Sequence, residues 1–197
     1  MRPSVEPDVA LNSTIYKVSL NVADIDHGHY AEHNLTLALH PSETTQRLMA
    51  RIVAFALNAH DIDDRCQGDA AFDFGKGLCE PGDPDMALVD FTQAIRLWID
   101  IGQSDDKALA KACSRSEAVA LYPYLETAHT WWKGLANKVS RLNKLGVYYL
   151  GDDFAQASEA LVQRSMVLQA TIQDGGLTLI GGDTVLSVTP DCWQAPR

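Results

Sequence analysis

Two aspartates, Asp85 and Asp100, stand at the outer ends of two apolar runs that a short polar segment separates. Apolar runs of this length on either side of a polar turn predict a β-hairpin. If the turn is centred near Thr92 and Gln93, Asp85 lies across the hairpin from Ile101 and next to Asp100. Carboxylate oxygens are the ligands that Mg²⁺ takes from proteins, together with several waters. The pair therefore predicts a binding site for a divalent cation. The alternative is that both acids end their strands and face water.

A third acid, Glu43, follows Pro41 and Ser42 at the start of an expected helix that ends between residues 58 and 60. Proline and serine favour a helix start, and a carboxylate there complements the positive end of the helix dipole. Glu43, Arg47 and Arg51 share one face of this helix, apart from its apolar stripe. Glu43 can therefore be a further metal ligand, or it can only cap the helix and pair with Arg47.

Hydrophobic periodicity predicts the elements that must position these acids. The segment 14–40 is expected to form a hairpin, and 61–69 a polar loop. Further strands are expected over 72–78, 86–91, 95–101, 118–122, 147–150, 166–172, 177–180 and 185–188, and further helices over 105–113, 127–137 and 153–163. The fold class is therefore α/β (mixed α+β): helices pack on one sheet, and the N-terminal hairpin and the late strands add a second, antiparallel layer.

The chain has 197 residues and a net charge of −10, which fits one domain over 13–197 behind a flexible leader over 1–12. We expect no membrane association, because no apolar run approaches the roughly 18 residues that a spanning helix needs. No export signal is visible, and the four cysteines are widely spaced. Reduced thiols and a cytoplasmic location are therefore expected.

The segment 107–144 is basic although the chain as a whole is acidic. It carries a net charge of +5, against −15 for the remaining residues, and it includes Tyr122, Tyr124, Trp131 and Trp132. Basic residues interleaved with aromatic residues are what a nucleic-acid groove needs, because they neutralise phosphates and stack on bases. Nucleic acid is therefore a candidate partner. The alternative is a solvated helix face with its aromatic residues in the core.

Histidines gather near the expected first turn, where His27, His29 and His33 lie close to Asp24 and Asp26. The two sides of a hairpin can bring such residues together around a metal ion. The spacing matches no standard ligand pattern, so the favoured interpretation is a histidine-rich turn without a metal.

Several segments resemble the YaeQ family of bacterial proteins, namely TIYKVSLNVADID, LTLALHPSETTQRLMARI, GKGLC, LWIDIGQ, KALAKAC and LQATIQDG. The resemblance extends from about Ser13 to Trp193. This family is similar to a divergent branch of the PD-(D/E)XK nuclease-like superfamily, which implies a restriction-endonuclease-like αβββαβ core. Pro84 and Asp85 match the Pro-Asp of its motif, and Asp100 stands at the second acid. Glu43 matches an extra acid of some members.

The resemblance implies Mg²⁺ or Mn²⁺ held by Glu43, Asp85 and Asp100, and a metal-dependent nuclease as the activity. The motif has a lysine two residues after its second acid, where this sequence has Gly102. That lysine steadies the attacking water or the developing charge. Some members carry it on a neighbouring helix, which makes Lys111 and Lys107 candidates.

Gln103 can orient a water in place of this lysine. Without a substitute cation, the fold would instead serve a non-catalytic protein that binds nucleic acid or protein. A binder of proteins or small ligands that uses the late strands and Trp131 or Trp132 is a third possibility.

Overall fold

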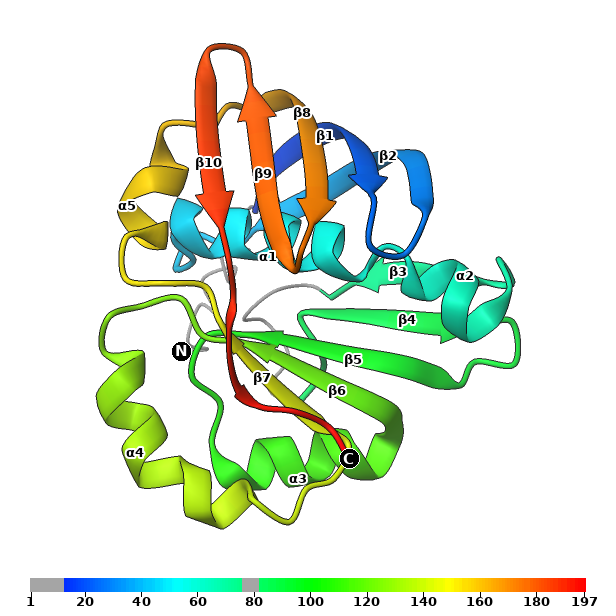
Figure 1. Cartoon of the computed structure of the whole chain (residues 1–197), viewed down its shortest axis with the longest axis vertical. Coiled ribbons are helices and arrows are strands. Elements are labelled where there is room, and N and C mark those ends of the chain that lie inside the picture. Colours follow the sequence, from blue (N-terminus) through cyan, green and yellow to red (C-terminus); the bar gives the residue numbers. More distant parts are fainter. Residues whose placement is uncertain (1–12, 76–81) are drawn as a thin grey trace, which may run out of the picture.

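The computed structural model describes residues 13–75 and 82–197, which form two β-sheets and five helices (Figure 1). The five-stranded sheet has the order β10-β9-β8-β1-β2. Its strands are β1 (Thr14–Asp24), β2 (His29–Leu39), β8 (Ser165–Gln173), β9 (Gly176–Gly181) and β10 (Thr184–Val188). The six-stranded sheet has the order β11-β7-β6-β5-β4-β3. Its strands are β3 (Ala70–Phe74), β4 (Met86–Asp90), β5 (Ile95–Ile101), β6 (Ser116–Tyr122), β7 (Leu145–Tyr149) and β11 (Asp191–Gln194).

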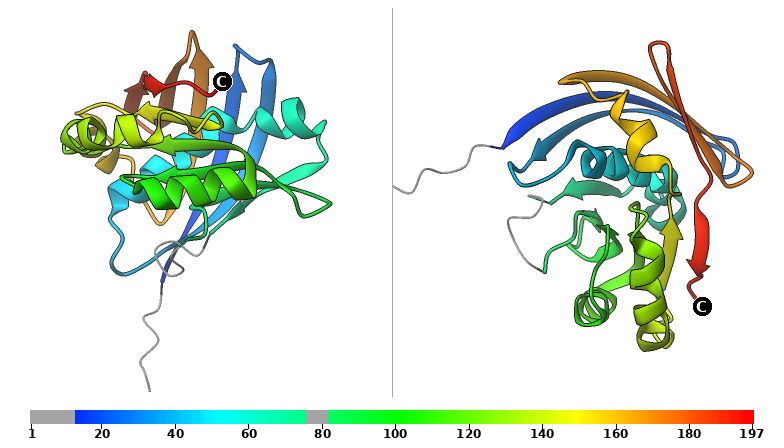
Figure 2. Two further views of the ribbon diagram at one scale, coloured as in Figure 1. Left: turned by 90° about the horizontal axis from the view of Figure 1, so that it is seen from below. Right: turned by 90° about the vertical axis from the view of Figure 1, so that its left-hand side faces the viewer.

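Helix α1 (Thr45–Asn58) lies between the two sheets, and the five-stranded sheet arches over it (Figure 2). Its apolar stripe, which includes Leu48, Ile52 and Phe55, is buried in the main core together with residues from both sheets. Thr44 caps the helix, because its hydroxyl accepts a hydrogen bond from the Arg47 amide. A helix covered on both sides explains why even one of its arginines, Arg51, is fully buried.

A second, smaller core lies on the other face of the six-stranded sheet, where α3 (Asp106–Arg115) and α4 (Ala128–Val139) pack (Figure 2). Trp98 of β5 faces this core, whereas its neighbours Leu97 and Ile99 face the main core. This alternation is the period-two pattern of a strand buried on both faces. The two shorter helices are α2 (Asp61–Cys66), which follows α1, and α5 (Phe154–Glu159), which contacts α1 and β10.

The mixed α+β fold with two sheets is as predicted, and the 14–40 hairpin is confirmed. Three expectations about the elements are wrong. The segment 61–69 is not all loop, because 61–66 form α2. The second layer is not purely antiparallel, because β1 and β8 pair in parallel, Leu20 opposite Leu168. Strand β8 enters from α5 rather than from a hairpin turn, so it can take either direction.

The third correction concerns Glu43, which was expected in the first turn of the first core helix. The helix begins at Thr45 with Thr44 as its cap, so Glu43 lies before the helix, and its carboxylate accepts a hydrogen bond from the His40 amide at 3.3 Å. The expected strand 72–78 is shorter, ending at Phe74, and its last residues lie outside the described part of the chain.

The hairpin that carries the two aspartates forms as predicted, with a change of register. Met86 pairs with Ile99, and a β-bulge between Leu88 and Val89 shifts the pairing by one residue towards the turn. Continuing this register places Asp85 opposite Asp100 rather than opposite Ile101. The bulge therefore brings the two acids closer in register than the sequence indicated.

Within the described residues, no helix is both long and apolar enough to cross a membrane. The expected leader over 1–12 lies outside the described residues, and the single domain over 13–197 stays a prediction. Three cysteines of the described part are free thiols, Cys66, Cys113 and Cys192, and Cys79 lies outside it.

Candidate functional site

Asp85 is a buried carboxylate held by one arginine and one backbone amide. Arg47 of α1 donates from Nη2 to both carboxylate oxygens of Asp85, at 2.6 and 2.7 Å, and the Ile101 amide donates to Oδ2 at 2.7 Å. Charge-assisted contacts of this length are strong and fix the carboxylate in place. Asp85 is thereby tied to both α1 and the end of β5.

Glu43 meets the same arginine from the other side. Its Oε1 lies 3.3 Å from Nε of Arg47 and 3.5 Å from Nη1 of Arg51. Arg51 also donates to the Ala38 carbonyl at 3.0 Å. The i,i+4 pair of Glu43 and Arg47 that the sequence offered as an alternative is therefore present. We call the group Glu43, Arg47, Asp85 and Asp100 the acid–arginine cluster.

Asp100 sits beside Asp85 and keeps its proton to a higher pH than an ordinary aspartate. Its Oδ1 accepts a hydrogen bond from the Trp98 indole at 2.8 Å. Burial, and secondly the negative charge of Asp85, raise the pKa of Asp100 to about 6. The cationic groups nearby do not fully offset this penalty, so a further positive charge would be favourable at this end of the sheet.

Gly102 shows why no lysine stands two residues after Asp100. Its φ of +97° is unfavourable for a residue with a side chain, and a Cβ atom there would lie 3.2 Å from Nη1 of Arg47. Arg47 therefore occupies the space next to Gly102. The cation of this cluster comes from α1, which the sequence interpretation missed. The available signal was the spacing of Glu43, Arg47 and Arg51, assigned there to one face of the helix.

The other expected participants lie elsewhere. The Lys111 ammonium donates to the Gly82 carbonyl at 3.2 Å, and Lys107 is exposed on the same helix, α3. Gln103 is exposed and donates to the Thr127 hydroxyl at 2.9 Å, at the start of α4. In the described residues, the cation that contacts Asp85 is thus Arg47 rather than Lys111. The roles of Lys111 and Gln103 stay predictions.

The basic segment 107–144 forms most of α3, then β6 and α4, and five of its seven basic residues lie on the two helices that cover one face of the six-stranded sheet. The other two, Arg141 and Lys144, follow α4. Trp131 and Trp132 are both half-buried, and Trp132 stacks on Trp193 of β11 with ring centroids 5.8 Å apart. Neither tryptophan is fully exposed, because β11, which the sequence did not indicate, covers this end of α4.

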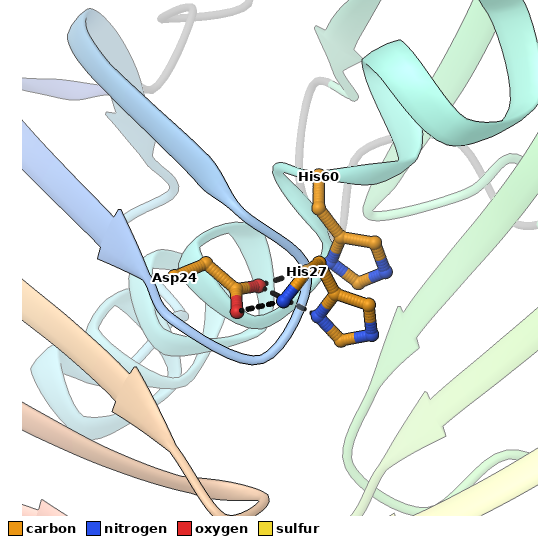
Figure 3. A group of neighbouring side chains, drawn as sticks. All are labelled: Asp24, His27 and His60. Atoms are coloured by element: carbon orange, nitrogen blue, oxygen red, sulfur yellow. Dashed lines mark hydrogen bonds and ion pairs between the residues drawn. The ribbon is translucent and has the colours of Figure 1, made fainter.

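A second group of titratable side chains lies between the sheets, at the turn that the sequence marked as histidine-rich. Asp24 at the end of β1 contacts His27 in the turn and His60, which precedes α2 (Figure 3). His29 and His33 do not join them. His29 instead contacts Asp63 at 2.8 Å and His33 at 3.4 Å. His60 was missed, because it is 33 residues from His27 and only the fold brings it near.

This arrangement of two sheets around one helix is shared with known proteins. The family model described as YaeQ protein matches residues 9–190. The chain belongs to the YaeQ family. It is 39% identical over 189 residues to the uncharacterized protein YaeQ of Escherichia coli (strain K12), covering 95% of this chain and 99% of that protein.

Two solved structures have the same fold. The YaeQ protein from Xanthomonas axonopodis pv. citri is 40% identical, with a TM-score of 0.84 over 93% of this chain and 99% of that one. The YaeQ protein from Pseudomonas syringae is 24% identical, with a TM-score of 0.82 over 94% of this chain and 98% of that one. The family resemblance stated from the sequence is therefore confirmed.

Proposed function

We propose that the acid–arginine cluster is a phosphodiester-processing site of the PD-(D/E)XK type, in which Asp85, Asp100 and Glu43 hold Mg²⁺ or Mn²⁺ and Arg47 replaces the motif lysine. The observation that carries this proposal is the place of Arg47, whose guanidinium contacts Asp85 and lies next to Gly102. The order α1, β3, β4, β5, α3, β6 also agrees with the αβββαβ core of that superfamily, apart from the inserted α2.

The donor types of this cluster suit a hard divalent cation, although in the described residues the ligand atoms of Glu43, Asp85 and Asp100 do not all lie within 4.8 Å of one another, so ion binding would have to draw them together. Asp85 and Asp100 present carboxylate oxygens at the end of paired strands, and oxygen is the ligand that Mg²⁺ and Mn²⁺ favour. The raised pKa of Asp100 indicates uncompensated negative charge, which a cation would stabilise. A bound ion of this kind polarises a phosphate and lowers the pKa of its water.

The residues of the chain then have distinct tasks. Arg47 would fix Asp85 and present a guanidinium, which suits the planar oxygens of a phosphate. Glu43 and Asp85 both form ion pairs with Arg47, at 3.3 and 2.6 Å, so the guanidinium is oriented before any substrate binds. The exposed lysines and arginines of α3 and α4 would contact the phosphates of a nucleic acid, which is the partner that we propose.

One observation favours a second candidate, a non-catalytic protein that binds nucleic acid or protein with this fold. Both carboxylate oxygens of Asp85 already accept hydrogen bonds from Arg47, and Oδ2 also accepts one from the Ile101 amide. In that case the guanidinium is the permanent counter-ion of Asp85 and takes the place of the metal. The two candidates differ in what removal of Arg47 does to metal binding.

Calorimetric titration with MnCl₂ tests both candidates on the wild type, on Asp85→Asn/Asp100→Asn and on Arg47→Met. Asp73→Asn is the control, because it removes an exposed acid from the same sheet. The nuclease-like proposal predicts one saturable site in the wild type and in the control, and none in the double variant. Arg47→Met should keep the site but should not hydrolyse labelled DNA or RNA with Mn²⁺.

The opposite pattern supports the second candidate. If the wild type binds no Mn²⁺ up to millimolar concentration, Asp85 and Asp100 do not form a metal site while Arg47 is present. If Arg47→Met then gains a site that Asp85→Asn removes, the arginine is the counter-ion that replaces the metal. Wild-type binding that survives in the double variant contradicts both candidates.

A further inference from the structure

Asp24, His27 and His60 converge from segments that the fold brings together. Asp24 ends β1 and His27 lies in the following turn, whereas His60 links α1 to α2. The Nδ1 atoms of His27 and His60 lie 2.9 and 3.4 Å from Oδ2 of Asp24. One oxygen and two imidazole nitrogens thus lie within 4.8 Å of one another (Figure 3).

The charges and hydrogen bonds of this group are incomplete. The side chain of Asp24 is fully buried, and among the described residues only imidazoles lie within ion-pair distance of it. Nδ1 of His60 is buried and has no hydrogen-bond partner, although it faces the carboxylate of Asp24. Buried polar atoms are normally paired, and an unpaired imidazole nitrogen beside a buried anion is a group that a bound cation would satisfy.

We propose that Asp24, His27 and His60 form a binding site for a transition-metal ion of the Zn²⁺ class. Imidazole nitrogen with one carboxylate is a ligand set that Zn²⁺ accepts, and it is poorly suited to Mg²⁺. Tetrahedral Zn²⁺ with bonds of about 2.0–2.1 Å separates its ligand atoms by about 3.3 Å. The two separations from Oδ2 of Asp24, 2.9 and 3.4 Å, are close to this spacing.

The two imidazole rings must move slightly to bind an ion. They are stacked with centroids 3.6 Å apart and an angle of 2° between their planes, so their in-plane lone pairs run parallel. Binding would tilt the rings until both lone pairs meet one ion. His27 can do so easily, because its side chain is 42% exposed and lies in a turn.

The site would have room for a further ligand of the ion. Three protein ligands leave the fourth position of Zn²⁺ open, which is typical of sites that bind water or a small molecule. His27 and His60 line a cavity of about 420 Å³ that Asn58, Tyr122 and Tyr148 also line. The metal would therefore be reachable from a chamber between the two sheets, and it would tie the β1–β2 turn to the end of α1.

Titration of the tag-free, full-length protein with Co²⁺ tests this site, because Co²⁺ replaces Zn²⁺ and absorbs visible light when bound with tetrahedral geometry. We expect one Co²⁺ per chain, displaced by Zn²⁺. His27→Gln and His60→Gln should each weaken binding by about 100-fold or more, since even loss of an outer-shell partner weakens metal sites by about 10–100-fold. Far-UV circular dichroism and thermal melting without metal check that both variants fold.

Two controls separate this site from its neighbours. His33→Gln alters the adjacent pair of His29 and His33, and Asp85→Asn/Asp100→Asn alters the acid–arginine cluster; both should keep Co²⁺ binding. Binding that His33→Gln abolishes and His27→Gln leaves intact would overturn the proposal. The absence of a visible Co²⁺ band in the wild type would also overturn it, as would binding in His27→Gln and His60→Gln that is as strong as in the wild type. Neither result bears on Mn²⁺ binding at the acid–arginine cluster.

Discussion

The arginine between Glu43 and Asp85 allows a quantitative test of how strongly α1 is tied to the hairpin. Arg47→Met keeps an apolar side chain of similar length but removes the contacts to Asp85 and to the Ile101 carbonyl. The side chains of Arg47 and Asp85 are only 16% and 7% exposed. Removing one partner of a buried ion pair costs about 3–5 kcal/mol, whereas an exposed pair contributes about 0–1 kcal/mol. We expect a loss of about 3 kcal/mol, because Arg47 keeps some contact with solvent.

The assay is urea denaturation of the wild type, Arg47→Met, Asp85→Asn and the double variant, followed by circular dichroism. The double variant should be more stable than the sum of the single losses predicts, by about 1–3 kcal/mol, because residues in direct contact are coupled. Arg65→Met is the control: Arg65 also pairs with an aspartate, Asp61, but it is 39% exposed, and a loss of less than about 1 kcal/mol is expected. A loss below about 1 kcal/mol for Arg47→Met, with no coupling to Asp85, would refute this reasoning.

Three further predictions concern the same end of the molecule. The carboxyl of Asp100, with its pKa raised from 3.8 to about 6, binds a proton more tightly in the folded than in the unfolded chain. This contribution to stability is lost as the pH rises from about 4 to 6, so the stability of Asp100→Asn relative to wild type should rise by about 2–3 kcal/mol over this range in urea melts. If the stability difference between Asp100→Asn and the wild type stays the same over this pH range, the charge of Asp100 is not buried. Gly102→Ala should cost about 1–3 kcal/mol, because the methyl group meets Arg47 at a φ of +97°. Gly182→Ala should cost less, because its φ is +57° and the added methyl group has no atom within 4 Å. An equal cost for the two variants would show that the Arg47 side chain moves away from the methyl group at position 102. Lys107→Ala with Lys111→Ala should weaken DNA binding at low salt and reduce the slope of log K against log salt by about 1 per lysine. An unchanged slope would exclude α3 from the interface.

Most elements of the fold could be predicted because their signals are local. Alternation predicts β1 and the β4–β5 hairpin, and the 3.6-residue stripe of Leu48, Ile52 and Phe55 predicts α1. The errors fall where local signals compete. The acids and the arginine of 61–66 favour a loop by composition, but the short segment forms α2. Helix starts were also displaced, because Thr44 rather than Ser42 caps α1, and α3 begins at Asp106, one residue later than expected.

The candidate site could be predicted only in part. Asp85 and Asp100 were assigned to the end of one hairpin because a turn fixes which residues face each other. The bulge at Leu88 and Val89 changed that pairing by one residue, and nothing in the chain around it marks a bulge. The sequence places Glu43, Arg47 and Arg51 on one polar face of the helix. It does not show that the second sheet covers α1 and buries these charges.

The sequence by itself therefore determined the type of most elements, the family and the acids that end the hairpin. It did so because periodicity, turn residues and family segments are readable over short stretches of chain. The tertiary structure alone decided that Arg47 rather than Lys111 is the cation beside Asp85, that β1 and β8 pair in parallel, and that His60 joins Asp24 and His27. Each of these is a contact between residues distant along the chain, and such contacts depend on how two sheets pack around one helix rather than on any local pattern.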